Sequence, residues 1–312
     1  MLNIYEQIDA NKRRSFWVIA LFVVFVTAFG YFFSYIYGYD WTFLVLALIV
    51  SAVGSWISYY NSDSIALSLS GAYPVTHKTH PAYTNIVENL SRVARIPTPK
   101  TYLIDSPALN AFATGRDPQH GAICLTQGLL DTMTRTEIEG VVAHELSHIR
   151  NFDTRLMTIV AILVGSIAMV LNWSWRLSWH RGSGSRDNNR EGNAIIMVIG
   201  IIFIILAPII ASLIQLAISR RREFYADASA AHLTRQPSGL IGALKKIAAH
   251  QDIVLESAST ATAHLYIDDP MTVESHGSWL TKLFSTHPSI IERIKALEGN
   301  PSSRTDRHTP IK

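Results

Sequence analysis

Two histidines and a glutamate stand together at residues 144–148, where the sequence reads His-Glu-Leu-Ser-His. Two histidines four residues apart lie on the same face of a helix, one turn from each other. Both imidazoles can then reach one zinc ion at about 2.0–2.1 Å. The adjacent glutamate can take a proton from a water molecule held by that ion. The spacing therefore predicts metal-assisted hydrolysis, with His144 and His148 as ligands and Glu145 as the base.

The segment that carries this motif is predicted to be a helix. Thr134 and Glu137 match the pattern of a capping box, and so do Thr136 and Glu139. Apolar residues then recur at helical spacing as far as Ile149. The helix therefore has an apolar side that can bury the motif away from bulk water.

A hydrolytic zinc site needs a third protein ligand on another element. Downstream of a basic run at residues 220–222, the sequence supplies Glu223 and Asp227, one helical turn apart. Glu223 could bind the metal, and Asp227 could accept the spare ring N–H of a ligand histidine. The alternative is an exposed helix whose acids pair with the neighbouring arginines. The presence of the two-histidine motif favours the ligand interpretation.

Four stretches of the chain contain no Asp, Glu, Lys or Arg, and each reaches the roughly 20 residues that a membrane helix needs. The first two are separated by little more than Asp40 and predict a transmembrane hairpin. The last two either cross the membrane or dip into it, and for this pair the alternative is a pair of buried core helices. The stretches are residues 15–39, 41–62, 156–175 and 192–219.

The basic residues Lys12, Arg13 and Arg14 precede the first stretch and predict a cytoplasmic N-terminus. Both remaining segments then lie on the cytoplasmic face, whether or not the second pair crosses. We therefore expect a mainly α protein of the inner (plasma) membrane with four transmembrane helices. The predicted parts are a cytoplasmic N-terminus at 1–14, a transmembrane hairpin at 15–62, a first catalytic part at 63–155, a second helix pair with a loop at 156–219, and a second catalytic part at 220–312.

Composition excludes several other classes. The chain has 312 residues, of which 48% are hydrophobic, and this apolar content excludes a disordered protein. The single cysteine, Cys124, excludes a disulfide scaffold. A net charge of +3 is too small to indicate nucleic acid. The expected partners are therefore protein or peptide substrates and the lipid bilayer, and the sequence does not indicate an oligomeric state.

Two short strands are predicted at residues 110–115 and 122–126, around a glycine- and proline-containing turn. An edge strand of this kind can pair with the backbone of an extended substrate. The alternative is a strand that only covers the helical core. The candidate substrate-binding residues are Asn110, Ala111 and Phe112.

The order of these motifs resembles the HtpX-type membrane zinc metalloproteases, in the peptidase group that also holds the CAAX prenyl endopeptidases. The resemblance covers nearly the whole chain. After the N-terminal hairpin it comprises Asn-Ala-Phe-Ala-Thr-Gly at 110–115, Leu-Thr-Gln-Gly-Leu-Leu at 125–130, Glu-Gly-Val-Val-Ala-His-Glu-Leu-Ser-His-Ile at 139–149, Ser-Arg-Arg-Arg-Glu-Phe-Tyr-Ala-Asp-Ala at 219–228, Phe-Ser-Thr-His-Pro at 284–288 and Glu-Arg-Ile at 292–294.

This resemblance implies a zinc-dependent endopeptidase with a zincin-like α+β catalytic domain and a small edge sheet. It implies a role in stress response and in the quality control of membrane proteins. Zinc would be held by His144, His148 and Glu223, with Glu145 as general base and Asp227 as a partner of a ligand. His287 would lie close to the metal, as a transition-state donor or as an occluding ligand. The departures from the family at residues 289–290 leave the zinc site unaffected.

Two other functions compete with this interpretation. An intramembrane-cleaving protease would need the motif inside a span, but charged residues surround it. A non-enzymatic membrane protein with a structural zinc would need four protein ligands, for which His287 is the available fourth. A transporter is less favoured than either, because no charged residue lies inside any predicted span.

Overall fold

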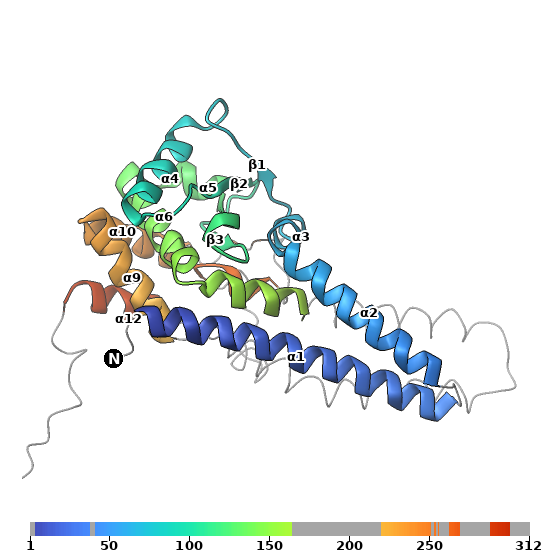
Figure 1. Cartoon of the computed structure of the whole chain (residues 1–312). Helices are drawn as coiled ribbons and strands as arrows, with labels where there is room; N and C mark the ends of the chain where they lie inside the picture. The colour runs from blue at the N-terminus through green and yellow to red at the C-terminus, as the bar shows by residue number, and fades with distance from the viewer. Residues whose placement is uncertain are drawn as a thin grey trace, which may run out of the picture.

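The computed structural model describes residues 4–37, 41–163, 220–250, 253, 255, 262–268 and 288–299. The loop at 176–191, the fourth predicted span and most of the third therefore lie outside the described residues. His287 also lies outside them, directly before the described Pro288. The described part of the chain is mainly helical and contains one small sheet (Figure 1).

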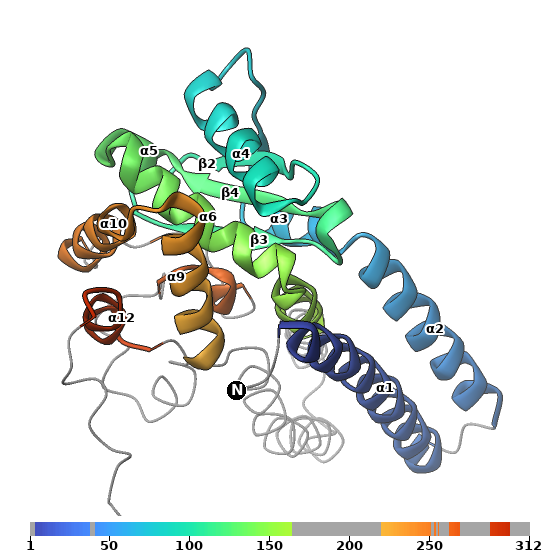
Figure 2. The same cartoon turned by 60° about the vertical axis from the view of Figure 1, so that its left-hand side comes forward.

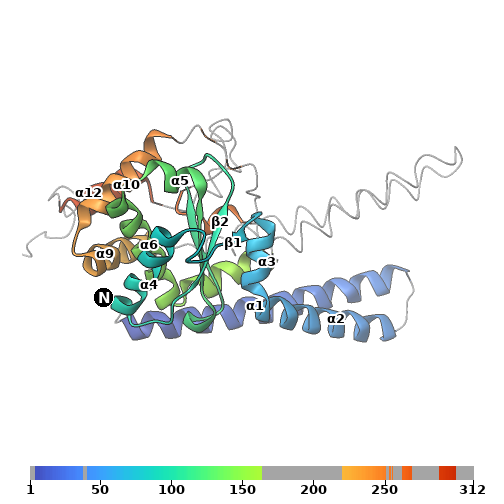
Figure 3. The same ribbon diagram turned by 90° about the horizontal axis from the view of Figure 1, so that it is seen from above.

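Two long helices form a hairpin that extends away from the rest of the described chain (Figures 1 and 3). Helix α1 spans Ile4–Tyr37 and helix α2 spans Trp41–Tyr60, so α1 begins well before the predicted span at residue 15. Among the helices that the structure describes, none combines the length and hydropathy that crossing a bilayer requires. Large apolar side chains are nevertheless exposed along both helices, among them Trp17 at 64% and Trp56 at 66%.

The sheet has four strands in the order β1-β2-β4-β3. Strands β2 and β4 are parallel, and the other two pairs are antiparallel. The two strands predicted around the turn are confirmed as β3 and β4, which pair from Ala111↔Leu125 to Thr114↔Ala122. The strands are β1 at Tyr73–Pro74, β2 at Lys100–Ile104, β3 at Ala111–Thr114 and β4 at Ala122–Thr126.

Alternation along β4 divides the interior into two apolar clusters, because neighbouring strand residues face opposite sides of a sheet. Ile123 and Leu125 pack into the cluster formed with the helices α4 (Pro81–Ala94) and α6 (Arg135–Arg150). Ala122 and Cys124 pack into a second cluster, which includes Leu156, Val160 and their neighbours. Residues 153–163 are helical, and residues 156–163 are buried, most of them in this cluster. For this first part of the third predicted span, the burial therefore matches the alternative of a core helix.

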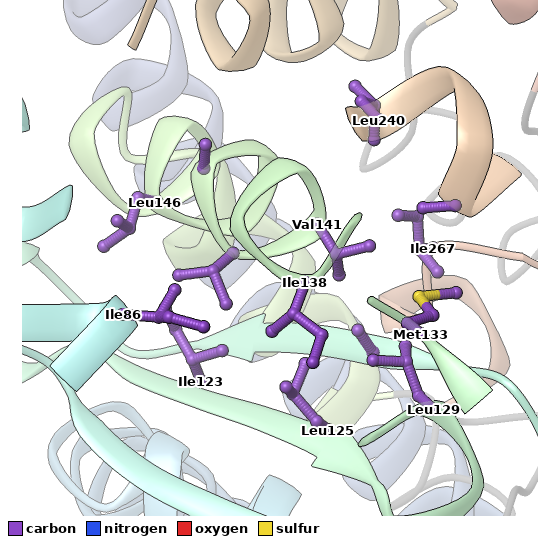
Figure 4. Close-up of a cluster of buried hydrophobic side chains, with 14 of the residues drawn as sticks. Ile86, Ile123, Leu125, Leu129, Met133, Ile138, Val141, Leu146, Leu240 and Ile267 are labelled. Atoms are coloured by element: carbon purple, nitrogen blue, oxygen red, sulfur yellow. The ribbon is translucent and has the colours of Figure 1, made fainter. Parts of the chain in front are cut away.

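Helix α6 lies between the sheet and a group of C-terminal helices (Figure 2). In the close-up of the core, Ile138 and Val141 of α6 lie between the sheet residue Leu125 on one side and Leu240 on the other (Figure 4). Full burial of each such side chain contributes about 1.5–3 kcal/mol. The C-terminal helices are α9 at Arg220–Thr234, α10 at Pro237–Ala249 and α12 at Ile290–Leu297, and the short elements are α3 at Ser62–Leu69, α5 at Gln127–Thr132, η1 at Pro118–His120 and η2 at Ala263–Leu265.

The N-terminus of α6 is fixed by a capping box formed by Thr134 and Glu137. The Thr134 hydroxyl accepts from the Glu137 backbone N–H, and the Glu137 carboxylate accepts from the Thr134 N–H at 2.8 Å. The prediction of this capping box is confirmed. The alternative box at Thr136 and Glu139 is wrong, because the helix has already begun at Arg135. Glu139 instead accepts from the Arg135 side chain at 2.9 Å.

A pair of glycines allows α6 and α10 to approach closely. A Cβ atom at Gly140 would lie 2.5 Å from the Leu240 backbone nitrogen, and one at Gly239 would lie 2.4 Å from the Thr136 carbonyl oxygen. Both distances are far shorter than van der Waals contact. The close approach places the C-terminal helices directly against the helix that carries the two histidines.

Candidate metal centre and active site

Helix α6 brings His144, Glu145 and His148 into the interior of the described chain, where each residue is at most 5% exposed. The two imidazole rings stand almost perpendicular, at 86°, with centroids 4.7 Å apart. Their Nε2 atoms face each other at 3.2 Å. The helical spacing thus places two ring nitrogens around one point, as the sequence predicted.

Glu223 reaches the same point from α9, which packs against α6. Its Oε2 lies 3.5 Å from His144 Nε2, and its Oε1 lies 3.7 Å from His148 Nε2. One ligand atom from each residue lies within 4.8 Å of the other two. Two segments separated by a predicted membrane portion therefore supply one cluster of two imidazoles and one carboxylate.

The spacing of this cluster fits a zinc ion. Two nitrogens bound at 2.0–2.1 Å with a tetrahedral angle between them lie roughly 3.3–3.4 Å apart, close to the observed 3.2 Å. Two imidazoles and a carboxylate are a common ligand set of hydrolytic zinc sites, which leave a fourth position for water. The donor set and its dimensions therefore suit a catalytic divalent cation.

Asp227 and Arg293 lie behind His144. Asp227 Oδ1 is 3.0 Å from His144 Nδ1, the ring nitrogen that faces away from Glu223. The Arg293 guanidinium donates to both Asp227 oxygens, at 2.9 Å from Nε and 2.7 Å from Nη2. It also donates to the Ile267 carbonyl at 3.2 Å. Arg293 is fully buried, and it holds the carboxylate in the orientation that meets His144.

His148 has a carboxylate of its own, which sequence reasoning did not identify. Asp153 Oδ2 lies 3.1 Å from His148 Nδ1, and the other Asp153 oxygen accepts from Asn11 of α1 at 2.7 Å. An acid five residues after a ligand histidine is a signal that could have pointed to this contact. Nothing in the spacing points to Asn11, or to Arg293 as the residue that binds Asp227.

The three predicted substrate residues are buried at the edge of the sheet. Ala111 and Phe112 open β3, and their outer side is already paired with the chain's own residues 266–267. The Ile267 N–H donates to the Ala111 carbonyl at 2.9 Å, and the Asn110 side chain donates to the Asp268 carbonyl at 3.0 Å. Residues 266–268 of the same chain therefore occupy the edge of β3 at the predicted substrate-binding residues.

The sequence profile of Peptidase family M48 matches residues 76–300. The chain belongs to peptidase family M48. The matched region contains both histidines of the motif, Glu223 and Asp227, so the cluster described above lies wholly within the family's domain.

Curated relatives of this M48 chain are similar along almost its whole length. The Protease HtpX homolog of Streptococcus uberis is 40% identical over 298 residues, covering 94% of this chain and 99% of that protein. The Protease HtpX homolog of Lactobacillus acidophilus is 43% identical over 301 residues, covering 95% and 99%. The crystal structure of S. mikatae Ste24p is 19% identical with a TM-score of 0.45, and the match covers 95% of this chain and 66% of that one.

These findings confirm the predicted family resemblance and the predicted enzyme class. The M48 chain is a metalloendopeptidase, and a divalent metal ion is the cofactor that its family implies.

The electrostatics of the M48 site are dominated by burial and by close charges. Burial and the Arg293 charge both lower the pKa of His144, but hydrogen bonds to Asp227 and Glu223 outweigh them and raise it to about 9. Burial raises the pKa of Glu145, against the opposing effect of the two histidines.

Proposed function

We propose that this chain is a zinc-dependent endopeptidase that cleaves extended segments of membrane proteins or of cytosol-exposed protein loops. The observation that carries the proposal is the convergence of His144, His148 and Glu223 within 4.8 Å. The two histidines lie on α6, the helix that also carries Glu145, and Glu223 lies on the neighbouring helix α9. These residues supply three protein ligands and a base, which is the composition of a hydrolytic zinc site.

The chemistry is divided between the metal and the protein. When bound, zinc lowers the pKa of a water molecule toward about 7 and polarises a carbonyl group. Glu145 takes the proton of the attacking water and passes it to the leaving amine. The buried environment raises the pKa of Glu145, which makes the carboxylate a stronger base than an exposed glutamate. A base is most effective when its pKa lies near the working pH.

Asp227 and Arg293 keep His144 ready for this reaction. The Asp227 carboxylate accepts the Nδ1 proton of the ring, so that Nε2 carries the lone pair toward the metal position. Arg293 holds both carboxylate oxygens and neutralises their charge in the protein interior.

We further propose a binding position for the substrate backbone and a role for His287. An extended substrate would pair with the edge of β3 near Asn110, Ala111 and Phe112. It would have to displace the chain's own residues 266–267, which pair there. His287 would approach the metal from the segment just before α12, as a transition-state donor or an occluding ligand. Both roles of His287 rest on the family resemblance.

The proposed location is the inner (plasma) membrane, with the catalytic part on the cytoplasmic face. Its support is the apolar surface of the α1–α2 hairpin, where side chains such as Leu21, Val24 and Val53 are more than half exposed. The basic residues 12–14 support a cytoplasmic N-terminus. A role in the quality control of damaged membrane proteins follows from the resemblance to HtpX-type proteases.

The deep burial of the cluster favours one second candidate, a membrane protein with a structural zinc. His144, His148 and Glu223 are 1%, 5% and 3% exposed, and a structural site is closed to water. Such a site would need a fourth protein ligand and would not need Glu145.

The two functions are separated by comparing wild type with Glu145→Gln. Both proteins are purified in detergent, their zinc content is measured, and cleavage of casein is followed with and without a chelator. We expect equal zinc content, chelator-sensitive cleavage by wild type and none by Glu145→Gln. Cleavage by the variant at the wild-type rate would remove Glu145 from its role. Stoichiometric zinc without cleavage by either protein would support the structural site.

A further inference from the structure

We propose that Asn11 of helix α1 is a positioning residue for the metal site, acting through Asp153 on the ligand His148. The inference rests on the proposed function, since it takes His148 to be a metal ligand. The N-terminal part of α1 would then contribute to the metal site, while the C-terminal part of the same helix lies in the apolar hairpin.

The first step is the contact between His148 and Asp153. Asp153 Oδ2 lies 3.1 Å from His148 Nδ1, and the two residues are 5% and 3% exposed. A carboxylate that accepts the Nδ1 proton fixes the tautomer and the plane of the ring, so that Nε2 offers its lone pair to the metal. Nε2 is the atom that faces His144 and Glu223. Asp153 therefore does for His148 what Asp227 does for His144.

The second step is what orients Asp153. The Asn11 side-chain amide donates to Asp153 Oδ1 at 2.7 Å and to the Asn151 carbonyl at 3.1 Å. Asn11 is only 3% exposed, although it lies 142 positions from Asp153 in the chain. One amide group thus holds both the carboxylate and the residue that ends α6.

The third step is a competing charge. Arg222 Nη1 lies 3.6 Å from the same Asp153 oxygen that Asn11 holds. Without the Asn11 amide, the carboxylate is free to turn toward the guanidinium and away from His148. A neutral donor on α1 therefore keeps the anion aligned with the ring without removing its charge.

The turn between α6 and the next helix needs this support. Phe152 has φ 59°, a left-handed conformation that is costly for a residue with a bulky side chain. Lys12, next to Asn11 on α1, places its ammonium 4.7 Å from the centre of the Phe152 ring. Two successive residues of α1 therefore contact three successive residues, 151–153, at a strained turn and the start of the next helix. Asp153 is presented to His148 only while that turn is held.

The proposal is tested on the full-length protein in detergent, by competing zinc away with a chromophoric chelator. The variants are Asn11→Ala, Asp153→Ala and the double variant. Ser15→Ala is the matched control, because Ser15 is equally buried on α1 but its hydroxyl donates to the Asn11 carbonyl and not to Asp153. The visible spectrum of the cobalt-substituted proteins reports ligand geometry independently of activity.

Loss of the outer partner of a metal ligand typically costs about 10–100-fold in affinity. We expect this loss for Asp153→Ala, a smaller loss for Asn11→Ala with an altered cobalt spectrum, and wild-type behaviour for Ser15→Ala. Because Asn11 acts through Asp153, the double variant should bind zinc as Asp153→Ala does. The proposal would be overturned if Asn11→Ala weakened zinc binding as much in the Asp153→Ala background as in the wild type. That result would show a general packing effect.

Asn11→Asp covers the case in which Asn11→Ala does not fold. It keeps the shape of the side chain but replaces the donor with an acceptor, and we expect weakened zinc binding. Wild-type affinity in this variant would also overturn the proposal. A failure of the proposed function would look different: wild type would bind zinc and cleave nothing, while the pattern among the Asn11 and Asp153 variants would still decide this inference.

Discussion

The body around the sheet buries charged side chains, whereas the α1–α2 hairpin exposes large apolar ones. The body encloses ionisable groups, including Glu145, Glu223 and Arg293, each at most 3% exposed. The hairpin leaves large apolar groups such as Leu21 and Trp56 more than half exposed. In the body, Arg293 can be buried because it binds Asp227 at 2.7 Å and lies 3.8 Å from Glu223, so that opposite charges meet at close range. The hairpin has an apolar surface that water does not favour.

Helix α1 belongs to both regions. Asn11 and Ser15 are 3% and 0% exposed and lie against the body, whereas Phe16 and Trp17 are 63% and 64% exposed. The two environments lie on different faces of this helix, because Val18, one turn after Ser15, is again buried in the second apolar cluster. Substitutions in the body and in the hairpin should have different consequences, and these can be ranked by size.

The largest effect is expected from Glu223→Ala. Removing the carboxylate leaves two imidazoles, so zinc and cleavage should be lost together. Zinc content and casein cleavage of the purified variant measure this, with Glu145→Gln as the control that should keep zinc. Stoichiometric zinc in Glu223→Ala would show that the third ligand is another residue.

A large effect on stability is expected from Asp227→Ala. The change leaves the fully buried Arg293 without its closest anion, and breaking a buried pair in this way costs about 3–5 kcal/mol. Chemical denaturation of the metal-free protein measures the free energy of unfolding. Replacing both partners, by Asp227→Leu with Arg293→Met, should cost less than the single change. A larger cost for the double variant would contradict this account of the pair.

An intermediate effect distinguishes glycines in the two regions. Gly140→Ala places a Cβ against the Leu240 backbone, and overpacking of this kind costs about 1–3 kcal/mol. Gly54→Ala in α2 has no atom within 4 Å of the new Cβ. It should be neutral or stabilising by up to about 1 kcal/mol, the difference in helix propensity. Equal unfolding free energies for the two variants would contradict the close approach of α6 and α10.

A smaller effect, dependent on pH, is expected from Glu137→Gln. Partial burial alone would raise the pKa of Glu137, but hydrogen bonds from Lys246 and Thr134 outweigh it and lower the pKa below 4.5. A lowered pKa in the folded state means that the carboxylate stabilises the fold above pH 4.5, and that this is lost as the pH falls through the folded-state pKa.

The expected cost of Glu137→Gln near neutral pH is about 1 kcal/mol, as for loss of a helix cap. Denaturation of the metal-free protein from pH 7 down to pH 3 measures how this cost disappears. Glu139→Gln is the control, because its exposed pair with Arg135 contributes only a few tenths of a kcal/mol. If the loss of unfolding free energy caused by Glu137→Gln grew as the pH fell, the predicted lowering of the Glu137 pKa would be contradicted.

The smallest effect on the body is expected from a charge in the hairpin. Val53→Arg changes a residue that is 51% exposed on α2. In detergent it should alter the unfolding free energy of the body by no more than about 0.5 kcal/mol, while lowering the fraction of protein recovered in membranes. Zinc binding weakened as much as in Asp153→Ala would show that the hairpin and the metal site are not separate.

The sequence by itself determined the parts of this protein that depend on local spacing. The residues His144 and His148 face one point because a helix repeats every 3.6 residues. The capping box at Thr134 and the strands around residues 110–126 also follow from short-range patterns. Membership of the family followed from the order of several such motifs along the chain.

Only the tertiary structure decided which distant residues complete the site. Asn11 meets Asp153 across 142 positions, and Arg293 meets Asp227 across 66. A lone asparagine on a helix and a lone arginine after Thr-His-Pro carry no periodic signal, because their partners are chosen by helix packing and not by spacing. The same packing buries residues 156–163 against the sheet, since an apolar run suits a protein core as well as a bilayer.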